Sequence, residues 1–229
     1  VYGRMEKKVF AALDGAFLVN SRIKVPCEAV VIRGAMKALP EPFLFAPVTK
    51  KPKLLFASTL DTQRGIDVLL EALPYTKEDF ILTITGRGEG EEKIRACGDQ
   101  RIRFLGYLDY ETYKKELADA DICINAQLAN HAFAEFSFPS KIYEYLSAGK
   151  LVISSDMADV EEALGGAGIV YHDDAPEKLA EAIDRAIALK RDDAANERQR
   201  ERILRVVEEN SIGRVAEKVN QLLDKVSGR

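Results

Sequence analysis

Strand-like and helix-like segments alternate from Lys53 to about residue 190 of this 229-residue chain. Six short runs have the apolar or β-branched content of strands, namely KLLFAST, FILTIT, IRFLG, DICINA, LVISS and GIVY, and helical patterns separate them. Strands that are apolar on both faces are typical of a parallel sheet that helices cover on both sides. The alternation therefore predicts an α/β fold with a Rossmann-like, doubly wound parallel sheet over residues 50–190.

The two ends of the chain depart from this alternation. Residues 1–49 contain one helical pattern, GRMEKKVFAAL, and two strand patterns, GAFLVNS and EAVVIRG, before a Pro- and Lys-rich segment typical of an extended linker. Residues 191–229 contain two charged, amphipathic helical patterns, whose charges we interpret as a solvated face. Because the first residue is Val1 and no signal peptide follows it, we expect the chain to be part of something longer.

Composition narrows the classes of partner. The formal net charge is −4 and the pI about 5.5, which gives no electrostatic reason to expect nucleic acid as the main partner. Cys27, Cys97 and Cys123 lie far apart without a CxxC spacing, which favours reduced thiols in a cytosolic protein. No apolar run approaches the roughly 20 residues that span a bilayer.

Candidate binding residues follow the predicted strands, whose carboxyl ends share one rim of a parallel sheet. Arg64 and Gly65 open the helix after KLLFAST, where an arginine and free backbone N–H groups could hold a phosphate. Gly86 and Gly88 in TGRGEG permit a tight turn close to a ligand. Each feature also has an ordinary explanation, an exposed arginine or a turn glycine, so none of them decides the function alone.

The segment FPSKIYEYLSAGK, residues 138–150, is the most distinctive. Pro139 fits the first helical turn, and we expect the N–H groups of residues 140–142 to lack intrahelical acceptors and to form an anion pocket. Glu144 follows one turn later, where a carboxylate could accept hydrogen bonds from the vicinal hydroxyls of a ribose. The alternative is a surface helix with an ordinary Lys141–Glu144 pair. Either explanation fits the segment taken in isolation.

These pieces, in this order, resemble the C-terminal half of GT-B glycosyltransferases, in particular the large retaining family 4 group, over roughly residues 16–226. Where that family has Gly-Arg after the first strand, this chain has Ser58-Thr59, and the family's Lys-Gly pair appears as Arg64-Gly65. TGRGEG looks like the family's Gly-x-Gly turn. FAEFSFPSKIYEYLSAGKLVISSD is similar to the E(x7)E region in its PSKxxEYxxxGKPVI version.

The resemblance implies a role for each matching residue. Arg64 would grip the diphosphate of a nucleotide sugar, and Glu144 would bind the ribose hydroxyls. Glu135 would contact the donor sugar as the candidate catalytic residue, although it precedes Glu144 by nine positions where the family has eight, which requires a bulged loop. The other donor-binding residues that the resemblance implies are Thr59, Gly65, Gly86, Gly88, Tyr107, Leu108, Phe138, Pro139, Ser140 and Lys141.

The implied function is a retaining, metal-independent glycosyltransferase without a cofactor. It would move a sugar from a UDP-, GDP- or other nucleotide-diphosphate sugar to a glycan or lipid-linked acceptor, in the cytoplasm or at the inner face of the membrane. Residues 1–49 would end the acceptor domain, residues 191–229 would pack back toward it, and the chain alone would catalyse little. Thr59 would remove one of two phosphate cations.

Two alternatives stay open. One is a sugar-nucleotide 2-epimerase of the same architecture, and the other is a non-catalytic nucleotide-binding or assembly module, which Thr59 favours. A dinucleotide oxidoreductase is disfavoured, because no GxGxxG with a later acidic residue follows the first strand.

Overall fold

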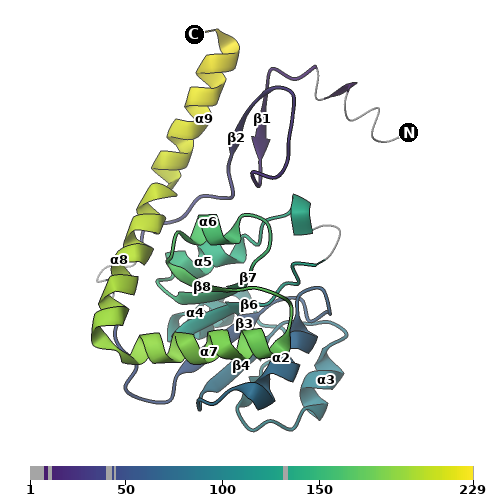
Figure 1. The fold of residues 1–229 in the computed structure, drawn as a ribbon, viewed down its shortest axis with the longest axis vertical. Helices are drawn as coiled ribbons and strands as arrows, with labels where there is room; N and C mark the ends of the chain where they lie inside the picture. The colour runs from purple at the N-terminus through teal and green to yellow at the C-terminus, as the bar shows by residue number, and fades with distance from the viewer. Residues whose placement is uncertain (1–7, 10–11, 40–42, 44, 131–133, 229) are drawn as a thin grey trace.

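The computed structural model describes residues 8–9, 12–39, 43, 45–130 and 134–228. Its centre is a six-stranded parallel sheet in the order β5-β4-β3-β6-β7-β8 (Figure 1). The strands are β3 (Lys53–Ala57), β4 (Ile81–Thr85), β5 (Ile102–Phe104), β6 (Ile122–Asn125), β7 (Leu151–Ser155) and β8 (Gly168–Tyr171). The predicted doubly wound parallel sheet is thereby confirmed.

The strand order reverses between β3 and β6. The chain runs outward from β3 through β4 to β5, then returns to the other side of β3 and runs outward again through β7 to β8. In sheets of this kind, ligands bind outside the carboxyl ends of the strands at such a switch point. The topology therefore directs attention to the loops that follow Ala57 and Asn125.

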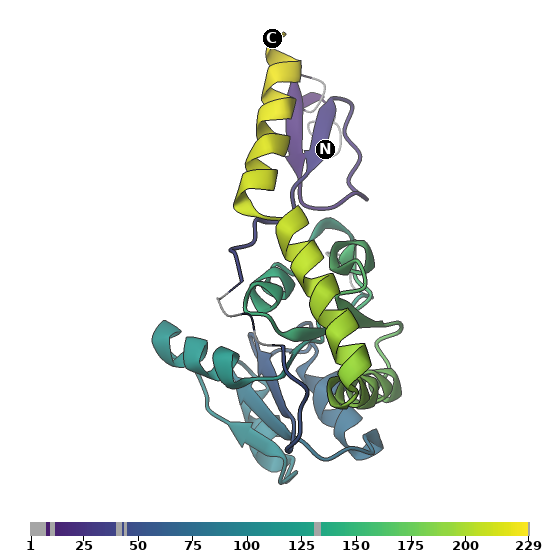
Figure 2. The ribbon, with the colours of Figure 1, turned by 90° about the vertical axis from the view of Figure 1, so that its left-hand side faces the viewer.

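Two layers of helices cover the sheet (Figure 2). Helices α2 and α7 pack against each other on one face, whereas α4 and α5 lie on the other, with α5 against β6 and β7. Leu54, Leu55 and Phe56 are all buried, which confirms that β3 is apolar on both faces. The helices around the sheet are α2 (Ile66–Ala72), α3 (Glu91–Ala96), α4 (Tyr110–Asp119), α5 (Lys141–Ser147), α6 (Val160–Leu164) and α7 (Pro176–Arg191), with short 3₁₀ helices η1 (Leu73–Tyr75) and η2 (Ala134–Phe136).

Local sequence explains where several helices begin and end. Asp109 caps α4 because its side chain accepts a hydrogen bond from the Thr112 N–H at 2.9 Å. Pro176 occupies the first position of α7, as predicted, where its missing N–H costs nothing. Gly149 follows α5 in the left-handed conformation that the sequence predicts, with φ 70°.

The remaining elements lie beyond this domain. Strands β1 (Gly15–Leu18) and β2 (Glu28–Val31) form a separate parallel pair, and α8 (Asp193–Glu209) leads to α9 (Ile212–Ser227), which packs along them (Figures 1 and 2). The Lys225 ammonium lies 2.6 Å from the Glu28 carboxylate across this contact. Most of the helix predicted over GRMEKKVFAAL lies outside the described residues. Within that segment, Lys8 and Val9 are described, and both are helical.

A buried carboxylate ties the β1–β2 segment to the domain. Asp159, just before α6, accepts hydrogen bonds from the Ser21 N–H at 2.5 Å and the Ser21 hydroxyl at 2.9 Å. Arg33 reaches the same carboxylate at 2.6 Å, with side-chain exposures of 13% for Arg33 and 4% for Asp159. Burial alone would raise the pKa of Asp159, but the hydrogen bonds from Arg33 and Ser21 lower it below its usual range.

Asp159→Asn should destabilise the chain by about 3 kcal/mol at neutral pH, because it removes the buried carboxylate partner of Arg33 and leaves only the exposed Glu162 at 3.1 Å. A carboxyl group with a lowered pKa contributes stability above the usual aspartate range and loses it as pH falls through the lowered value. The difference between variant and wild type should therefore shrink below about pH 4. Denaturant unfolding at neutral and acid pH measures the difference in free energy of unfolding between Asp159→Asn and the wild type. Substitution of the exposed Glu161, Glu161→Gln, is the control. A difference that does not change with pH would contradict the prediction.

Candidate functional site

Two hollows meet where β3 and β6 end. The first, the β4 hollow, has a volume of about 330 Å³ and lies between the segments that follow β3, β4 and β5. The second, the β6 hollow, has a volume of about 490 Å³ and lies between the segments after β3 and β6 and the start of α5. They share Ala57, Ser58, Thr59 and Lys141, so they form one continuous depression at the switch point.

Most residues that the sequence singled out line this depression. The β4 hollow is lined by Thr59, Gly86, Tyr107, Leu108 and Lys141, and the β6 hollow by Thr59, Arg64, Phe138, Pro139, Ser140 and Lys141. Glu144 lines a neighbouring, more apolar hollow between α4 and α5. Glu135 belongs to η2, and its side chain lies outside the described part of the chain.

The predicted glycines position the loops of the site. Gly65 has φ 80°, and a Cβ atom there would lie 1.8 Å from the Ala126 carbonyl oxygen. Gly86 would meet the Ser58 oxygen at 1.8 Å in the same way. Gly65 and Gly88 line neither hollow, and a Cβ atom on Gly88 would lie 2.4 Å from the Leu60 oxygen. Close approach between rim loops therefore accounts for these glycines.

Arg64 is held over the β6 hollow by a residue that the sequence did not single out. Its guanidinium donates a hydrogen bond to the Gln127 side-chain oxygen at 2.5 Å, and Asp61 accepts from its backbone N–H at 2.7 Å. Gln127 is only 6% exposed and lines the β6 hollow. Its position directly after β6, at the switch point, is the signal that could have identified it.

Lys141 reaches inward from α5 to the end of β3. Its ammonium donates to the Ala57 carbonyl oxygen at 2.6 Å and lies 5.2 Å from the centre of the Tyr113 ring. The Tyr145 hydroxyl donates to the same oxygen at 3.3 Å. Burial lowers the pKa of Lys141, although the nearby Glu144 charge opposes that shift.

Tyrosines line the outer wall of the β4 hollow. Tyr107 is 71% exposed, and the Arg87 guanidinium lies 5.1 Å from the centre of its ring. The Tyr113 hydroxyl is buried without a hydrogen-bond partner that meets normal geometry among the described residues. Burial, and then the charge of Glu144, raise the pKa of Tyr113. The hydroxyl therefore stays protonated next to the carboxylate of Glu144.

The charge of the depression differs in sign from that of the chain. Three cations line the joined hollows, Arg64, Arg87 and Lys141, and no aspartate or glutamate does among the residues that the structure describes. The whole chain has a net charge of −4. A concave surface of one charge sign favours ligands of the other, and Arg and Lys are the side chains that recognise phosphates. The depression is thus suited to an anionic ligand.

The start of α5 differs from its prediction. The helix begins at Lys141, with Ser140 as its N-cap, so Pro139 precedes it. The Ile142 N–H donates to the Pro139 carbonyl oxygen at 3.0 Å. The prediction that all three N–H groups of residues 140–142 are free was therefore wrong, because a tight 3₁₀-type turn satisfies one of them.

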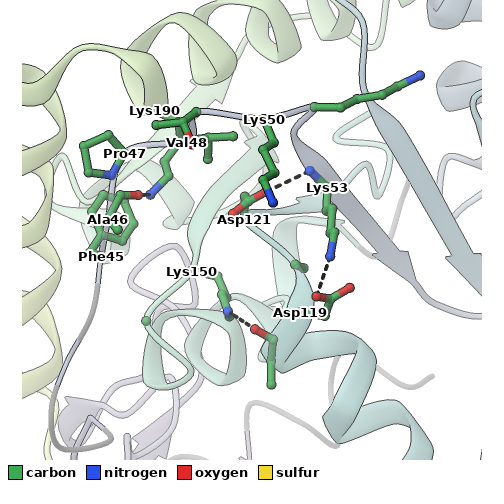
Figure 3. A pocket seen from close by; sticks show the side chains of 15 residues that line it. Phe45, Ala46, Pro47, Val48, Lys50, Lys53, Asp119, Asp121, Lys150 and Lys190 are labelled. Atoms are coloured by element: carbon green, nitrogen blue, oxygen red, sulfur yellow. Dashed lines mark hydrogen bonds and ion pairs between the residues drawn. The ribbon is translucent and has the colours of Figure 1, made fainter.

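A lysine-rich hollow of about 390 Å³ lies at the opposite edge of the sheet, beside the amino ends of β3 and β6 (Figure 3). Several of the cations in this hollow have partners. Lys53 contacts Asp119 at 2.6 Å, and Lys190 donates to the Ala46 carbonyl oxygen at 2.7 Å and lies over the Phe45 ring. Burial lowers the pKa of Lys190 to about 8. The contacts of Lys190 fix the linker segment around residue 46 to α7. Unlike the depression at the switch point, this hollow is also lined by two aspartates, Asp119 and Asp121.

One group of side chains could offer ligands to a metal ion. Ligand atoms of Asp156, Glu161 and His172 lie within 4.8 Å of one another, beyond the ends of β7 and β8. His172 Nδ1 lies 2.9 Å from the Asp156 carboxylate. None of the three lines the joined hollows.

Comparison with known families decides the assignment. The sequence model of the family described as glycosyl transferases group 1 matches residues 51–188, which contain all six strands of the central sheet. The chain belongs to this family. Its α/β fold, with the parallel sheet and the C-terminal helices, is that of the C-terminal half of a GT-B glycosyltransferase.

Individual relatives of this glycosyltransferase chain are distant. A phosphatidylinositol N-acetylglucosaminyltransferase subunit of Arabidopsis thaliana is 24% identical over 64% of the chain, which spans 34% of that protein. The apo lipopolysaccharide outer core galactosyltransferase WaaB is 18% identical, with TM-score 0.72, over 93% of the chain and 62% of its own. The pneumococcal O-GlcNAc transferase GtfA, in complex with UDP and GlcNAc, is 15% identical, with TM-score 0.69, over 100% of the chain and 48% of its own.

Among the described residues, no helix is both long and apolar enough to cross a membrane. The chain also covers less than two thirds of the length of these three relatives.

Proposed function

We propose that this chain is the donor-binding half of a glycosyltransferase that uses a nucleotide-diphosphate sugar. The observation that carries the proposal is the depression at the switch point, which three cations and no described carboxylate line in a chain of net negative charge. Family membership supports it, as does the complex of the similar pneumococcal transferase with UDP and GlcNAc.

The shape of the depression suggests how such a donor would lie. The base would occupy the β4 hollow against Arg87 and Tyr107, and the diphosphate would lie at the junction within reach of Arg64. The sugar would extend into the β6 hollow, toward the η2 segment that contains Glu135. Glu144 lines the neighbouring hollow, but it lies next to Tyr113 in the wall of the β4 hollow, and we propose that its carboxylate accepts hydrogen bonds from the ribose hydroxyls there.

Arg64 would also assist the reaction. The leaving nucleoside diphosphate gains negative charge in the transition state, and a fixed guanidinium close to it stabilises that charge. This assistance requires no metal. Retention at the anomeric carbon and catalytic contact from Glu135 follow from the family resemblance.

Residues 1–49 would form the end of the acceptor half, and sequence outside this chain would supply the rest of it. The exposed apolar side chains on β1 and around α9, such as Phe17 at 52% and Leu223 at 49% exposure, support further packing there. We propose a glycan or lipid-linked acceptor, and a location in the cytoplasm or at the inner face of the membrane. The chain alone should bind donor but transfer little sugar.

Calorimetry tests the donor site with the 229-residue chain. UDP or GDP should bind, and UMP or GMP should bind at least about tenfold more weakly, because a charge-assisted hydrogen bond to the second phosphate is worth about 1.5–3 kcal/mol. Absence of binding by every nucleoside diphosphate would contradict the proposed function and favour an assembly module.

Glu144 should account for recognition of the ribose. The wild type should bind UDP about tenfold more tightly than 2′,3′-dideoxy-UDP, whereas Glu144→Ala should bind the two alike, since the carboxylate that the hydroxyls contact is gone. Glu111→Ala, an exposed glutamate on α4, serves as the matched control. If Glu144→Ala still prefers UDP, another group binds the ribose.

A further inference from the structure

We propose that the lysine-rich hollow at the amino edge of the sheet is a second binding site, for a small soluble anion of the phosphate class. The ammonium groups of Lys150 and Lys190 would hold the anion between them. This site is separate from the depression at the switch point, and its existence does not depend on the proposed function. A bound anion would hold the linker before β3 against the domain.

Three segments of the chain form the walls of this hollow. They are residues 45–51 of the linker, residues 118–121 before β6 and residues 149–150 before β7, and Lys190 of α7 completes the lining (Figure 3). Each of the three segments leads into a strand, so the hollow lies at the edge opposite the joined hollows, and it shares no lining residue with them. An anion bound here would leave the switch point free.

Positive charge is in excess around the hollow. Its charged lining residues are five lysines and two aspartates, namely Lys50, Lys51, Lys53, Lys150, Lys190, Asp119 and Asp121. Lys51 lies 2.8 Å from the Asp79 carboxylate, and Lys53 lies 2.6 Å from that of Asp119. Among the described lining residues, Asp121 is then the one carboxylate left opposite three lysines. A concave surface with such an excess attracts anions.

The three remaining lysines have no close carboxylate. Among the described residues, no carboxylate oxygen lies within 4.0 Å of the nitrogens of Lys50, Lys150 or Lys190. Lys50 is exposed to solvent, whereas Lys190 is only 3% exposed. A buried charge without a counter-charge is costly, and an anion in the hollow would supply that counter-charge.

The two less exposed ammonium groups are already ordered. That of Lys190 donates to the Ala46 carbonyl oxygen at 2.7 Å and lies 3.6 Å from the centre of the Phe45 ring. That of Lys150 donates to the Ala118 carbonyl oxygen at 2.6 Å. Each ammonium has three N–H donors, so two remain on each for the oxygens of an anion. Because the side chains are held in place, binding costs little further conformational entropy.

The two ammonium groups also affect each other. Burial lowers the pKa of both lysines, and it lowers that of Lys190 to about 8. The charge of Asp121 opposes the shift at Lys190, whereas the charge of Lys150 adds to it. An anion between the two lysines would replace this repulsion with attraction to both.

An occupied hollow would change the linker. Lys190 already contacts it twice, through its ammonium and through its carbonyl oxygen, which accepts from the Val48 N–H at 2.8 Å. An anion held by Lys150 and Lys190 would add a contact between this linker, the segment before β7 and α7. Because the linker joins the β1–β2 segment to the domain, the anion would stiffen that connection.

Calorimetry with inorganic phosphate and with pyrophosphate tests the site, in chloride buffer of constant ionic strength. Lys150→Met and Lys190→Met should each weaken binding about 10- to 100-fold, because each removes charge-assisted hydrogen bonds. Lys178→Met, which removes an exposed lysine of α7 paired with Glu181, should bind within about twofold of wild type. Arg64→Ala should do the same, because Arg64 lines the other edge of the sheet.

Hydrogen exchange locates the anion. Pyrophosphate should slow exchange of the amides of residues 45–51 in the wild type and should leave it unchanged in Lys150→Met. Thermal unfolding first verifies the fold of each variant. Should Lys190→Met not fold, Lys50→Met replaces it, since Lys50 is exposed and lines the same hollow.

Three results overturn the inference. The first is that the wild type binds neither phosphate nor pyrophosphate, or that the folded lysine variants bind them as the wild type does. The second is that Arg64→Ala alone loses the affinity, which would place the anion at the switch point. The third is that the chain binds vesicles of phosphatidic acid and phosphatidylcholine but no free phosphate, which would assign the lysines to a lipid surface. None of these results decides whether the chain binds a nucleotide sugar.

Discussion

Gly65→Ala should destabilise the chain by about 2–6 kcal/mol and abolish the donor site. Two costs add, a left-handed conformation for a residue with a Cβ atom and overpacking against backbone, each worth about 1–3 kcal/mol. The contact is with the Ala126 carbonyl oxygen at 1.8 Å, which belongs to the neighbouring rim loop and not to a flexible side chain. Because domains of this size are stable by only about 5–15 kcal/mol, much of the chain should unfold at moderate temperature.

Gly98→Ala is the control for this prediction. Gly98 has a similar positive φ of 68°, but a Cβ atom there would meet nothing within 4 Å. Gly98→Ala should therefore lower the free energy of unfolding only by the strain of the left-handed conformation, about 1–2 kcal/mol. Denaturant unfolding of both variants measures the difference. Equal destabilisation would show that the two rim loops do not approach each other as closely as the structure indicates.

Arg64→Ala should weaken nucleoside diphosphate binding about 100-fold, near the upper end of the range for a charge-assisted hydrogen bond. The guanidinium is exposed and already oriented by the Gln127 side-chain oxygen at 2.5 Å, so its removal leaves the surrounding core intact. Stability should therefore change by less than about 0.5 kcal/mol. Calorimetry and thermal unfolding separate the two effects.

Arg214→Ala serves as the control for Arg64, since it removes an exposed arginine of α9 that is paired with Glu217. Its affinity for UDP and GDP should equal that of the wild type. The affinity of Gln127→Ala for UDP and GDP should lie between that of Arg64→Ala and that of the wild type, because this substitution frees the guanidinium without deleting it. An Arg64→Ala chain that binds diphosphates normally would exclude this arginine from the site.

The sheet could be predicted because its signals are local. Each strand is a short apolar run, as in Leu54, Leu55 and Phe56, and the helices between strands carry turn residues such as Gly149 at their ends. The rim could be predicted as well, since the carboxyl ends of parallel strands must lie together. Family membership and the GT-B half-fold that the motifs implied are confirmed.

The contacts within the site could not be predicted in the same way. Tyr113 and Lys141 are 28 positions apart, and only the packing of α4 beside α5 brings the ring to the ammonium. The hydrogen bond between Gln127 and Arg64 also joins two loops from neighbouring strands. The Ile142 N–H was misjudged because a sequence does not distinguish an open first turn from a tight one. The catalytic role of Glu135 stays a prediction.

A crystal structure of the chain with UDP or GDP, whichever binds more tightly, tests the central claim most directly. The diphosphate should lie at the junction of the two hollows, within reach of Arg64, and the base should lie in the β4 hollow against Arg87 and Tyr107. A nucleotide bound in the lysine-rich hollow around Lys53, Lys150 and Lys190, with the junction empty, would contradict it.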